Sequence, residues 1–267
     1  MKSRRTKFTL TTILLVAGVL ILLMTSSVFG KFSNVNGHPV KEKKVTIYLA
    51  GDSTVSNYPD TMAPRTGWGQ VLPEFFNHNV IIKNRAVPGR SSKSFITEGR
   101  LALILKQIHK GDYLFIQFGH NDEKYKDPKR FTKPFSTYKS FLKQYIDGAR
   151  QKGATPVLVT PMERRRFSSD GKVLETHGNY PASMRELGRD EHVSVIDLNA
   201  KSKRLYQRLG PEKTKELFMW IEPGTNPNYP RGVEDNTHFQ DKGAMEIAKM
   251  IVEGIREHEL GLRDYLK

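Results

Sequence analysis

Cysteine is absent from this 267-residue sequence. The chain therefore has no disulfide framework, and a lipoprotein anchor, which requires a cysteine, is excluded. Internal repeats and a boundary to a second domain are also missing. The basic residues are scattered and form no nucleic-acid-binding motif, so we expect no nucleic-acid partner.

The amino terminus combines four basic residues, no acidic residue and an uncharged apolar stretch over 8–30. This layout predicts a signal peptide over 1–30 that is cleaved near Gly30. The alternative is an uncleaved anchor, because residues 8–24 are nearly long enough to span a bilayer and could tether the protein to a membrane. We therefore expect a secreted, extracellular protein, or a membrane-anchored one that faces outward.

Positive charge is in excess, with a formal net charge of +15. Removing the four basic residues of the signal segment leaves +11 on the remaining 237 residues, which are enough for one domain with a substantial core. Such a protein is attracted to polyanions, including acidic polysaccharide, teichoic acid and anionic lipid. The alternative is that the charge only solvates the surface.

Residues 31–44 are polar and lack periodicity, which predicts a linker, and 45–267 read as one domain. Within it, apolar runs alternate with stretches of helical periodicity, which predicts a parallel sheet covered by helices on both faces. The expected strands are 45–50, 80–83, 112–118, 155–160 and 193–197. The expected helices are 68–76, 94–110, 137–151, 180–190, 199–220 and 243–257, with a loop over 221–236.

A cluster of polar residues follows each of the first three strands, around Ser53, Gly89 and Asn121. A parallel sheet gathers such positions along one edge, where ligands bind. Asp235 and His238, near the end of the chain, add an acid and a base. Ser53 has a simpler alternative role, because Asp and Ser after a strand commonly cap the next element.

A hydrolytic serine needs a base to take its proton, and the base needs an acceptor that orients it. Asp235 and His238, three residues apart, could supply both. Donors must also face the developing oxyanion. The backbone amides of Ser53 and Gly89 and the side-chain amide of Asn121 are suitable.

Four segments taken in order resemble the four sequence blocks of the SGNH (GDSL-type) hydrolases: Gly51-Asp52-Ser53, Gly89, Gly119-His120-Asn121-Asp122 and Asp235-Asn236-Thr237-His238. The resemblance implies a flavodoxin-like, three-layer α/β fold whose central, mostly parallel sheet has five strands flanked by helices. It implies Ser53, Asp235 and His238 as the catalytic triad. It also implies Ser53, Gly89 and Asn121 as the oxyanion hole, with no cofactor and no metal. The serine is not in a Gly-x-Ser-x-Gly elbow, which disfavours the α/β-hydrolase fold.

Within that family, Asn84-Arg85-Ala86, the segment 89–95, Thr160-Pro161 with 164–167, and 235–239 are similar to the bacterial rhamnogalacturonan acetylesterases. The likeness implies an exported serine esterase that removes O-acetyl groups from an acidic pectic polysaccharide through an acetyl-enzyme. A cationic enzyme suits an anionic substrate. Pro88 and several basic residues stand near the second block, where another glycine is expected.

Several residues have two possible interpretations, one functional and one structural. Arg164 begins a basic run that could bind uronate carboxylates or simply be solvated. Trp220 and Arg231 precede Asp235 and are candidate substrate contacts. Other candidates are His120 and Asp122, which could join Asp235 and His238 as metal ligands, although no compact ligand-pair motif is present and structural hydrogen bonds are the favoured reading. Trp68 could stack on a sugar, but its helical spacing with Phe75 favours the core.

Three alternative functions remain open at this point. The enzyme could deacetylate another polysaccharide, including peptidoglycan. The same triad could act on lipid or other acyl esters, which requires an extended apolar pocket. Finally, the chain could be a non-catalytic polysaccharide-binding protein. The sequence does not predict the oligomeric state.

Overall fold

The computed structural model describes residues 44–267. The predicted signal segment and almost all of the predicted linker lie outside the described residues. Across the described part of the chain, no helix is both long and apolar enough to cross a membrane.

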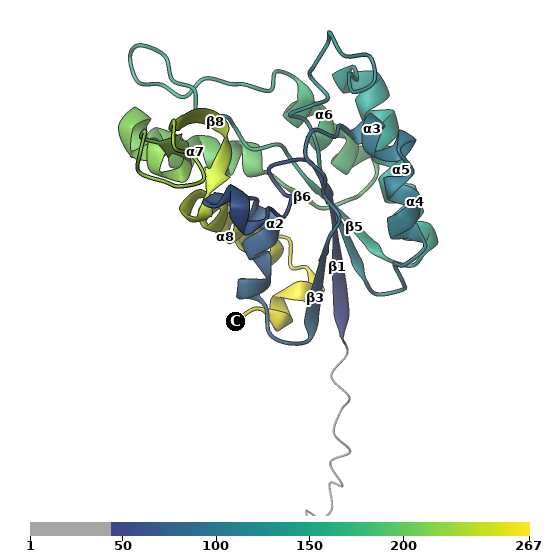
Figure 1. Cartoon of the computed structure of the whole chain (residues 1–267). Helices are drawn as coiled ribbons and strands as arrows, with labels where there is room; N and C mark the ends of the chain where they lie inside the picture. The colour runs from purple at the N-terminus through teal and green to yellow at the C-terminus, as the bar shows by residue number, and fades with distance from the viewer. Residues whose placement is uncertain (1–43) are drawn as a thin grey trace, which may run out of the picture. The chain divides into compact units, whose positions relative to one another are not determined.

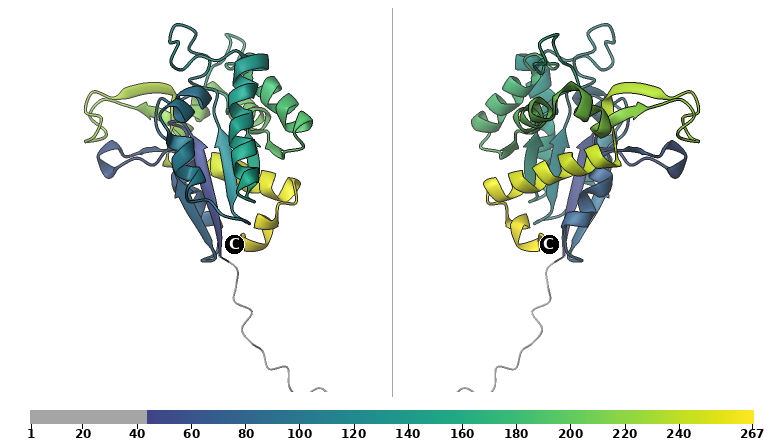
Figure 2. Two further views of the ribbon diagram at one scale, coloured as in Figure 1. Left: turned by 90° about the vertical axis from the view of Figure 1, so that its right-hand side faces the viewer. Right: turned by 90° about the vertical axis from the view of Figure 1, so that its left-hand side faces the viewer.

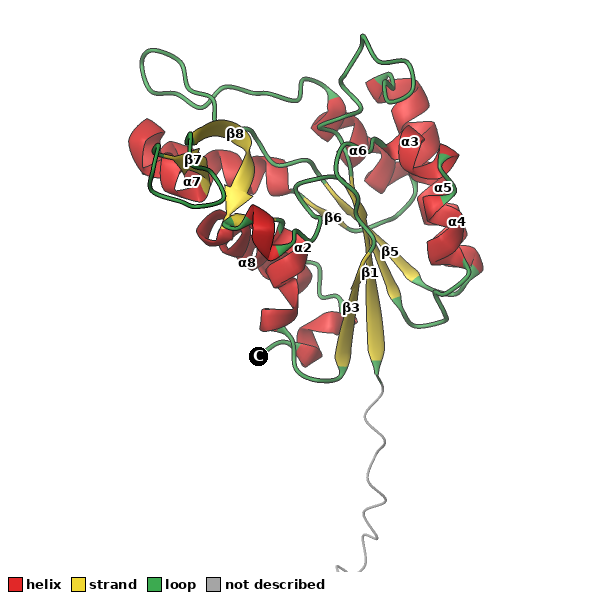
Figure 3. Cartoon of the chain, in the orientation of Figure 1, coloured by secondary structure: helices red, strands yellow, loops and turns green. Residues whose placement is uncertain are grey.

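A five-stranded parallel sheet forms the centre of the domain (Figure 3). Its order is β3-β1-β4-β5-β6, so the sheet strands taken in chain order run 2-1-3-4-5, the flavodoxin-like arrangement. This confirms the expected fold class. The strands are β1 (Val45–Gly51), β3 (Val80–Asn84), β4 (Tyr113–Gln117), β5 (Thr155–Val159) and β6 (Val195–Ile196).

Helices cover both faces of the sheet, which gives three layers (Figure 1). Ile47 and Leu49 of β1 pack into one apolar cluster, and Tyr48 and Ala50 into the other. This is why β1 is apolar without interruption from Ile47 to Ala50 and does not alternate with polar residues there. The helices on the first face are α2 (Trp68–Val71), α7 (Leu198–Lys213) and α8 (Asp241–Glu257). Those on the second are α3 (Ser92–Thr97), α4 (Arg100–Leu105), α5 (Lys139–Gln151) and α6 (Tyr180–Asp190).

The predicted helix over 94–110 is two helices. Gly99 stands between α3 and α4 with a φ of 73°, a left-handed conformation that ends one helix and lets the next begin. The second helix also ends earlier than expected, at Leu105. Apolar periodicity continues across such a break, so it does not reveal the break.

A second, antiparallel sheet of three strands was not expected. Its order is β2-β8-β7, formed by β2 (Arg65–Thr66), β7 (Phe218–Ile221) and β8 (Val233–Gln240). The predictions of a helix through residue 220 and of a loop through residue 236 are therefore wrong. β8 has the sequence VEDNTHFQ, in which Asp and Asn disfavour a strand, and it forms because β7 and β2 pair with its two edges.

The central sheet brings the predicted site residues together. Ser53 follows β1, Gly89 follows β3 and Asn121 follows β4, and these three strands are neighbours in the order β3-β1-β4. Because the strands are parallel, the three loops leave the sheet at the same edge. The β7–β8 hairpin and the segment before β2 project together from one side of the domain (Figure 2).

Candidate active site

Ser53 lies in a tight turn directly after β1. The backbone amides of Val55 and Ser56 each donate to the carbonyl of Asp52 at 3.2 Å, and the Asp52 carboxylate accepts from the amide and hydroxyl of Thr54 at 2.9 and 2.8 Å. Asp52 thus closes a local turn and does not cap the next helical element, which begins at Asp60 without a side-chain cap. The side chain of Ser53 is left to face His238.

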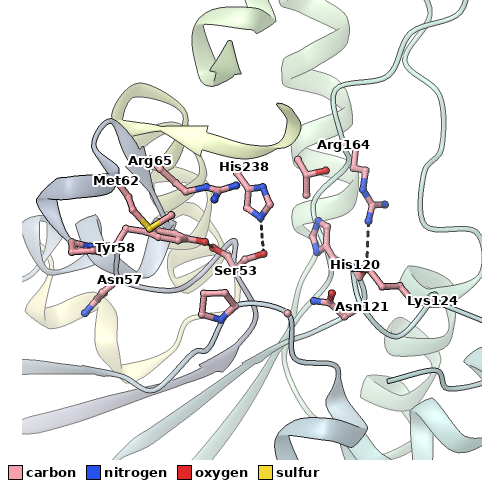
Figure 4. A pocket seen from close by; sticks show the side chains of 14 residues that line it. Ser53, Asn57, Tyr58, Met62, Arg65, His120, Asn121, Lys124, Arg164 and His238 are labelled. Atoms are coloured by element: carbon pink, nitrogen blue, oxygen red, sulfur yellow. Dashed lines mark hydrogen bonds between the residues drawn. The ribbon is translucent and has the colours of Figure 1, made fainter. Parts of the chain in front are cut away.

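Ser53, His238 and Asp235 form a hydrogen-bonded relay. His238 Nε2 lies 2.9 Å from Ser53 Oγ, and His238 Nδ1 lies 2.7 Å from Asp235 Oδ2 (Figure 4). A neutral imidazole that donates from Nδ1 to a carboxylate presents the lone pair of Nε2 to the serine hydroxyl. This arrangement suits proton transfer from the serine to the histidine.

Asp235 is held by four donors. Its Oδ1 accepts from the backbone amides of Thr237 and His238 at 2.8 and 3.1 Å, and its Oδ2 accepts from His238 and from Arg65 Nη2 at 3.0 Å. Burial by itself raises the pKa of Asp235, but the hydrogen bond and charge of His238 and the backbone donors outweigh burial. The pKa therefore lies well below its usual value, and the carboxylate remains charged.

Arg65 was not anticipated from the sequence. It contacts Asp235, which is 170 positions away in the sequence, so no local spacing predicts this pair. The β2–β8 pairing, which aligns Arg65 with Gln240, creates the contact. The guanidinium also lies 5.4 Å from the ring of Tyr58, whose hydroxyl donates to the Ser53 carbonyl at 2.7 Å.

The predicted oxyanion donors line the same pocket as Ser53 and His238. Neither the Ser53 nor the Gly89 backbone amide donates a hydrogen bond to another residue within 44–267, so both are available to a ligand. Gly89 has a φ of 81°, which glycine adopts without strain. Asn121 Nδ2 donates to the Arg90 carbonyl at 3.1 Å, which orients the amide and leaves its second hydrogen free.

The pocket has a volume of about 630 Å³. Cations line it at Arg65, Lys124 and Arg164, and its lining includes no Asp or Glu of the described chain (Figure 4). The other lining residues are Ser53, Asn57, Tyr58, Pro59, Met62, Pro88, Gly89, His120, Asn121, Thr237 and His238. The pocket therefore favours an anionic ligand.

His120 belongs to a buried cluster beside the pocket. Its Nδ1 lies 3.3 Å from Asp52 Oδ2, and its ring meets the ring of His177 edge to face at 4.5 Å. His177 in turn contacts Glu123 at 2.9 Å. Burial lowers the pKa of His120 to about 4, so its ring is neutral at pH 7. His177 and Glu123 belong to no sequence motif and were not expected at the site.

The metal alternative grouped His120 and Asp122 with Asp235 and His238. In the structure His120 contacts Asp52, while Asp122 accepts hydrogen bonds from Ser92 and Thr132. Over residues 44–267, no group of three or more His, Asp or Glu residues is arranged to hold a metal ion.

Of the three candidate substrate contacts, only Arg164 lies in the pocket with Ser53. Arg164 lines the pocket, where it forms an ion pair with Glu123 at 2.5 Å and donates to the His120 carbonyl. Trp220 and Arg231 line another cavity of about 210 Å³, so they do not surround Ser53. The Trp220 ring lies 4.6 Å from the guanidinium of Arg165, and its Nε1 donates to Asn236. Trp68 is fully buried in the core.

A parallel α/β domain with a Ser-His-Asp relay at the carboxyl edge of its sheet has the architecture of a serine hydrolase. The model of the GDSL-like lipase/acylhydrolase family matches residues 49–245. The chain belongs to this family and is a carboxylic ester hydrolase.

Two relatives from Bacillus subtilis (strain 168) match most of the chain. Rhamnogalacturonan acetylesterase RhgT is 52% identical over 225 residues, which cover 84% of this chain and 95% of the relative. The probable rhamnogalacturonan acetylesterase YesY is 44% identical, with coverages of 82% and 95%.

Solved structures share the fold. Protein YxiM of Bacillus subtilis superposes with a TM-score of 0.70 at 31% identity, covering 82% of this chain and 58% of that one. The acetylxylan esterase Axe2 of Geobacillus stearothermophilus gives a TM-score of 0.57 at 14% identity, with coverages of 80% and 94%. The second likeness concerns the fold alone.

Proposed function

We propose that this hydrolase removes O-acetyl groups from an acidic plant cell-wall polysaccharide, pectic rhamnogalacturonan. The observation that carries the proposal is the relay of Ser53, His238 and Asp235 opening into a pocket lined by cations and by no Asp or Glu within 44–267. The 52% identity to RhgT supports the same substrate.

In the proposed reaction, Ser53 Oγ attacks the acetyl carbonyl carbon while His238 Nε2 takes the hydroxyl proton. Asp235 orients the imidazole and stabilises its cation. The amides of Ser53, Gly89 and Asn121 donate to the oxyanion. His238 then returns the proton to the departing sugar oxygen, which leaves an acetyl-enzyme and a free sugar hydroxyl. Water attacks this ester by the same route and releases acetate.

The experiment is acetate release by the purified protein and by Ser53→Ala on acetylated rhamnogalacturonan, acetylated xylan and a long-chain ester. We expect selective release from the pectic substrate and at least about 10⁴-fold less with the variant. Equal rates on both acetylated polysaccharides would reject the pectin assignment. A preference for the long-chain ester would favour an acyl esterase, and inactivity of the folded wild type on all three would favour a binding protein.

We also propose that the enzyme acts outside the cell, after cleavage near Gly30. The basic and apolar amino-terminal segment and the anionic wall substrate support this location. Amino-terminal sequencing of the protein from the culture medium tests it. Recovery only from the membrane, with residue 1 or 2 at the amino terminus, would instead support the anchor through 8–24.

A further inference from the structure

The three cations of the pocket differ in how their charges are balanced. Arg65 forms an ion pair with Asp235 at 3.0 Å, and Arg164 forms one with Glu123 at 2.5 Å. Lys124 has no ion pair and no side-chain hydrogen bond among residues 44–267, although it lines the same pocket. Its ammonium group is therefore free to bind a ligand.

The backbone of Lys124 is held in the turn that carries Asn121, and its side chain lines the same pocket as Ser53. Its backbone amide donates to the Asn121 carbonyl at 3.3 Å, in the turn that follows β4. The proposed oxyanion donor and the lysine thus belong to one turn, three positions apart in the sequence. Figure 4 shows Lys124 on the Asn121 side of the pocket, across from Arg65.

The acids near Lys124 are engaged elsewhere. Glu123 binds Arg164 and His177, and Asp127 binds Arg130 at 2.5 Å. Partial burial, followed by repulsion from Arg130 and Arg164, lowers the pKa of Lys124, against the attraction of these two acids. The surroundings therefore disfavour the ammonium charge, and an incoming anion would offset that cost.

We propose that Lys124 binds the carboxylate of a uronic acid residue in the acetylated chain, and that this contact makes the enzyme prefer charged over neutral substrate. The inference rests on the proposed function and deepens it. An ammonium group is a compact charge on a flexible stem, which suits a carboxylate whose position varies along a polymer. Arg164, the candidate from the sequence, is already bound to Glu123, the His120 carbonyl and Thr176.

The test compares acetylated rhamnogalacturonan oligomers that carry free carboxylates with the same oligomers after methyl esterification. The measured quantity is the ratio of kcat/KM on the charged oligomers to kcat/KM on the neutral ones. In Lys124→Gln we expect this ratio to fall about tenfold, mainly through KM, since one charge-assisted hydrogen bond is lost. Lys124→Arg should keep most of the ratio, and Lys124→Glu should lower it further.

Lys126→Gln is the matched control. Lys126 is exposed on the same loop, as Lys124 is, and its Nζ lies 5.7 Å from the ring of Tyr125, but it does not line the pocket. The Lys126→Gln substitution removes one positive charge from the loop, as Lys124→Gln does, so it measures the long-range effect of charge alone. We expect its ratio to stay within about twofold of wild type, as for a screened surface charge.

The outcomes separate this inference from the proposed function. If wild type releases no acetate from either oligomer, the proposed function itself fails. If wild type prefers the charged oligomers and Lys124→Gln keeps that preference, or loses no more of it than Lys126→Gln does, then Lys124 does not bind the carboxylate. A wild type that deacetylates both oligomers equally well also overturns the inference.

Discussion

Asp235 is the residue at which the site's polar contacts converge. Two backbone amides, His238 and Arg65 all donate to its carboxylate. Each oxygen accepts two hydrogen bonds, so the carboxylate is held in one orientation. The imidazole of His238 is thereby fixed before substrate arrives, which is what electrostatic preorganisation requires.

Asn121 is the side chain whose proposed role is most directly measurable. Its amide is oriented by the Arg90 carbonyl, and one N–H remains for the oxyanion. We expect Asn121→Ala and Asn121→Asp each to lower kcat by about 10²- to 10³-fold, because both remove that donor. Steady-state kinetics on acetylated oligomers measures the loss, and circular dichroism checks that the variants remain folded. A folded Asn121→Asp enzyme with a kcat within tenfold of wild type would remove Asn121 from the oxyanion hole.

At the scale of elements, the turn that carries Ser53 depends on the close approach of α2. A Cβ at Gly67 would lie 2.2 Å from the Ser56 carbonyl oxygen, and one at Gly69 would lie 2.5 Å from the Val55 carbonyl oxygen. Only glycine allows these backbones to touch. The Gly67-Trp68-Gly69 segment therefore helps to position the turn that carries Ser53. Of these three residues, the sequence suggested a role only for Trp68.

Gly67→Ala should push this turn away from α2. Gly67 has a φ of −91°, which alanine adopts freely, so the effect is steric. We expect a loss of about 1–3 kcal/mol in the free energy of unfolding, and up to about a hundredfold in kcat/KM as Ser53 moves. Urea unfolding and steady-state kinetics measure the two effects.

Gly99→Ala is the control for Gly67→Ala. Gly99 has a φ of 73° and no atom within 4 Å of an added Cβ, so alanine there costs backbone strain of about 1–2 kcal/mol. Its kcat/KM should stay near wild type, because Gly99 does not line the pocket. If the two variants lose activity equally, the close approach at Gly67 is not what positions Ser53.

A second supporting element is the hairpin between β7 and β8. Tyr229 donates from its hydroxyl to the Met62 carbonyl at 2.9 Å, and Asn228 donates to the carbonyls of Asp60 and Ala63. Met62 and Arg65 line the pocket, so the hairpin holds one of its walls from outside.

Tyr229→Phe removes one of these hydrogen bonds and keeps the ring. We expect KM for the polysaccharide to rise about threefold to tenfold while kcat changes little, since about 1 kcal/mol of wall stabilisation is lost and the relay is untouched. Steady-state kinetics gives both constants, with the exposed Tyr125→Phe as control. A fall in kcat at constant KM would show instead that the hairpin acts on the relay through Arg65.

For the whole molecule, the buried His120 cluster links the site to acid stability. The pKa of His120 is about 4 in the fold, below the ordinary 6.5, because burial disfavours the charged ring. The unfolded chain therefore binds this proton more readily, and the stability that neutral His120 contributes is lost as the pH falls from about 6.5 toward 4. The groups that face the ring are Asp52, His177 and Arg164.

His120→Gln cannot titrate, so its stability should depend less on pH. We expect the free energy of unfolding of wild type to fall by about 3 kcal/mol more than that of the variant between pH 7 and pH 4. Urea unfolding at several pH values measures the difference. Parallel curves for the two proteins would mean that His120 is not buried as a neutral ring.

The sequence by itself determined the parallel sheet, both apolar faces and the order of the site residues, because buried strands and amphipathic helices carry local periodicity. Ser53, Gly89 and Asn121 could be placed together since each follows a strand of one parallel sheet. Only the tertiary structure decided that Asp235 and His238 lie in a strand, that Arg65 contacts Asp235, and that Arg164 lines the pocket while Trp220 does not. These depend on pairings between distant segments, which local propensity does not encode.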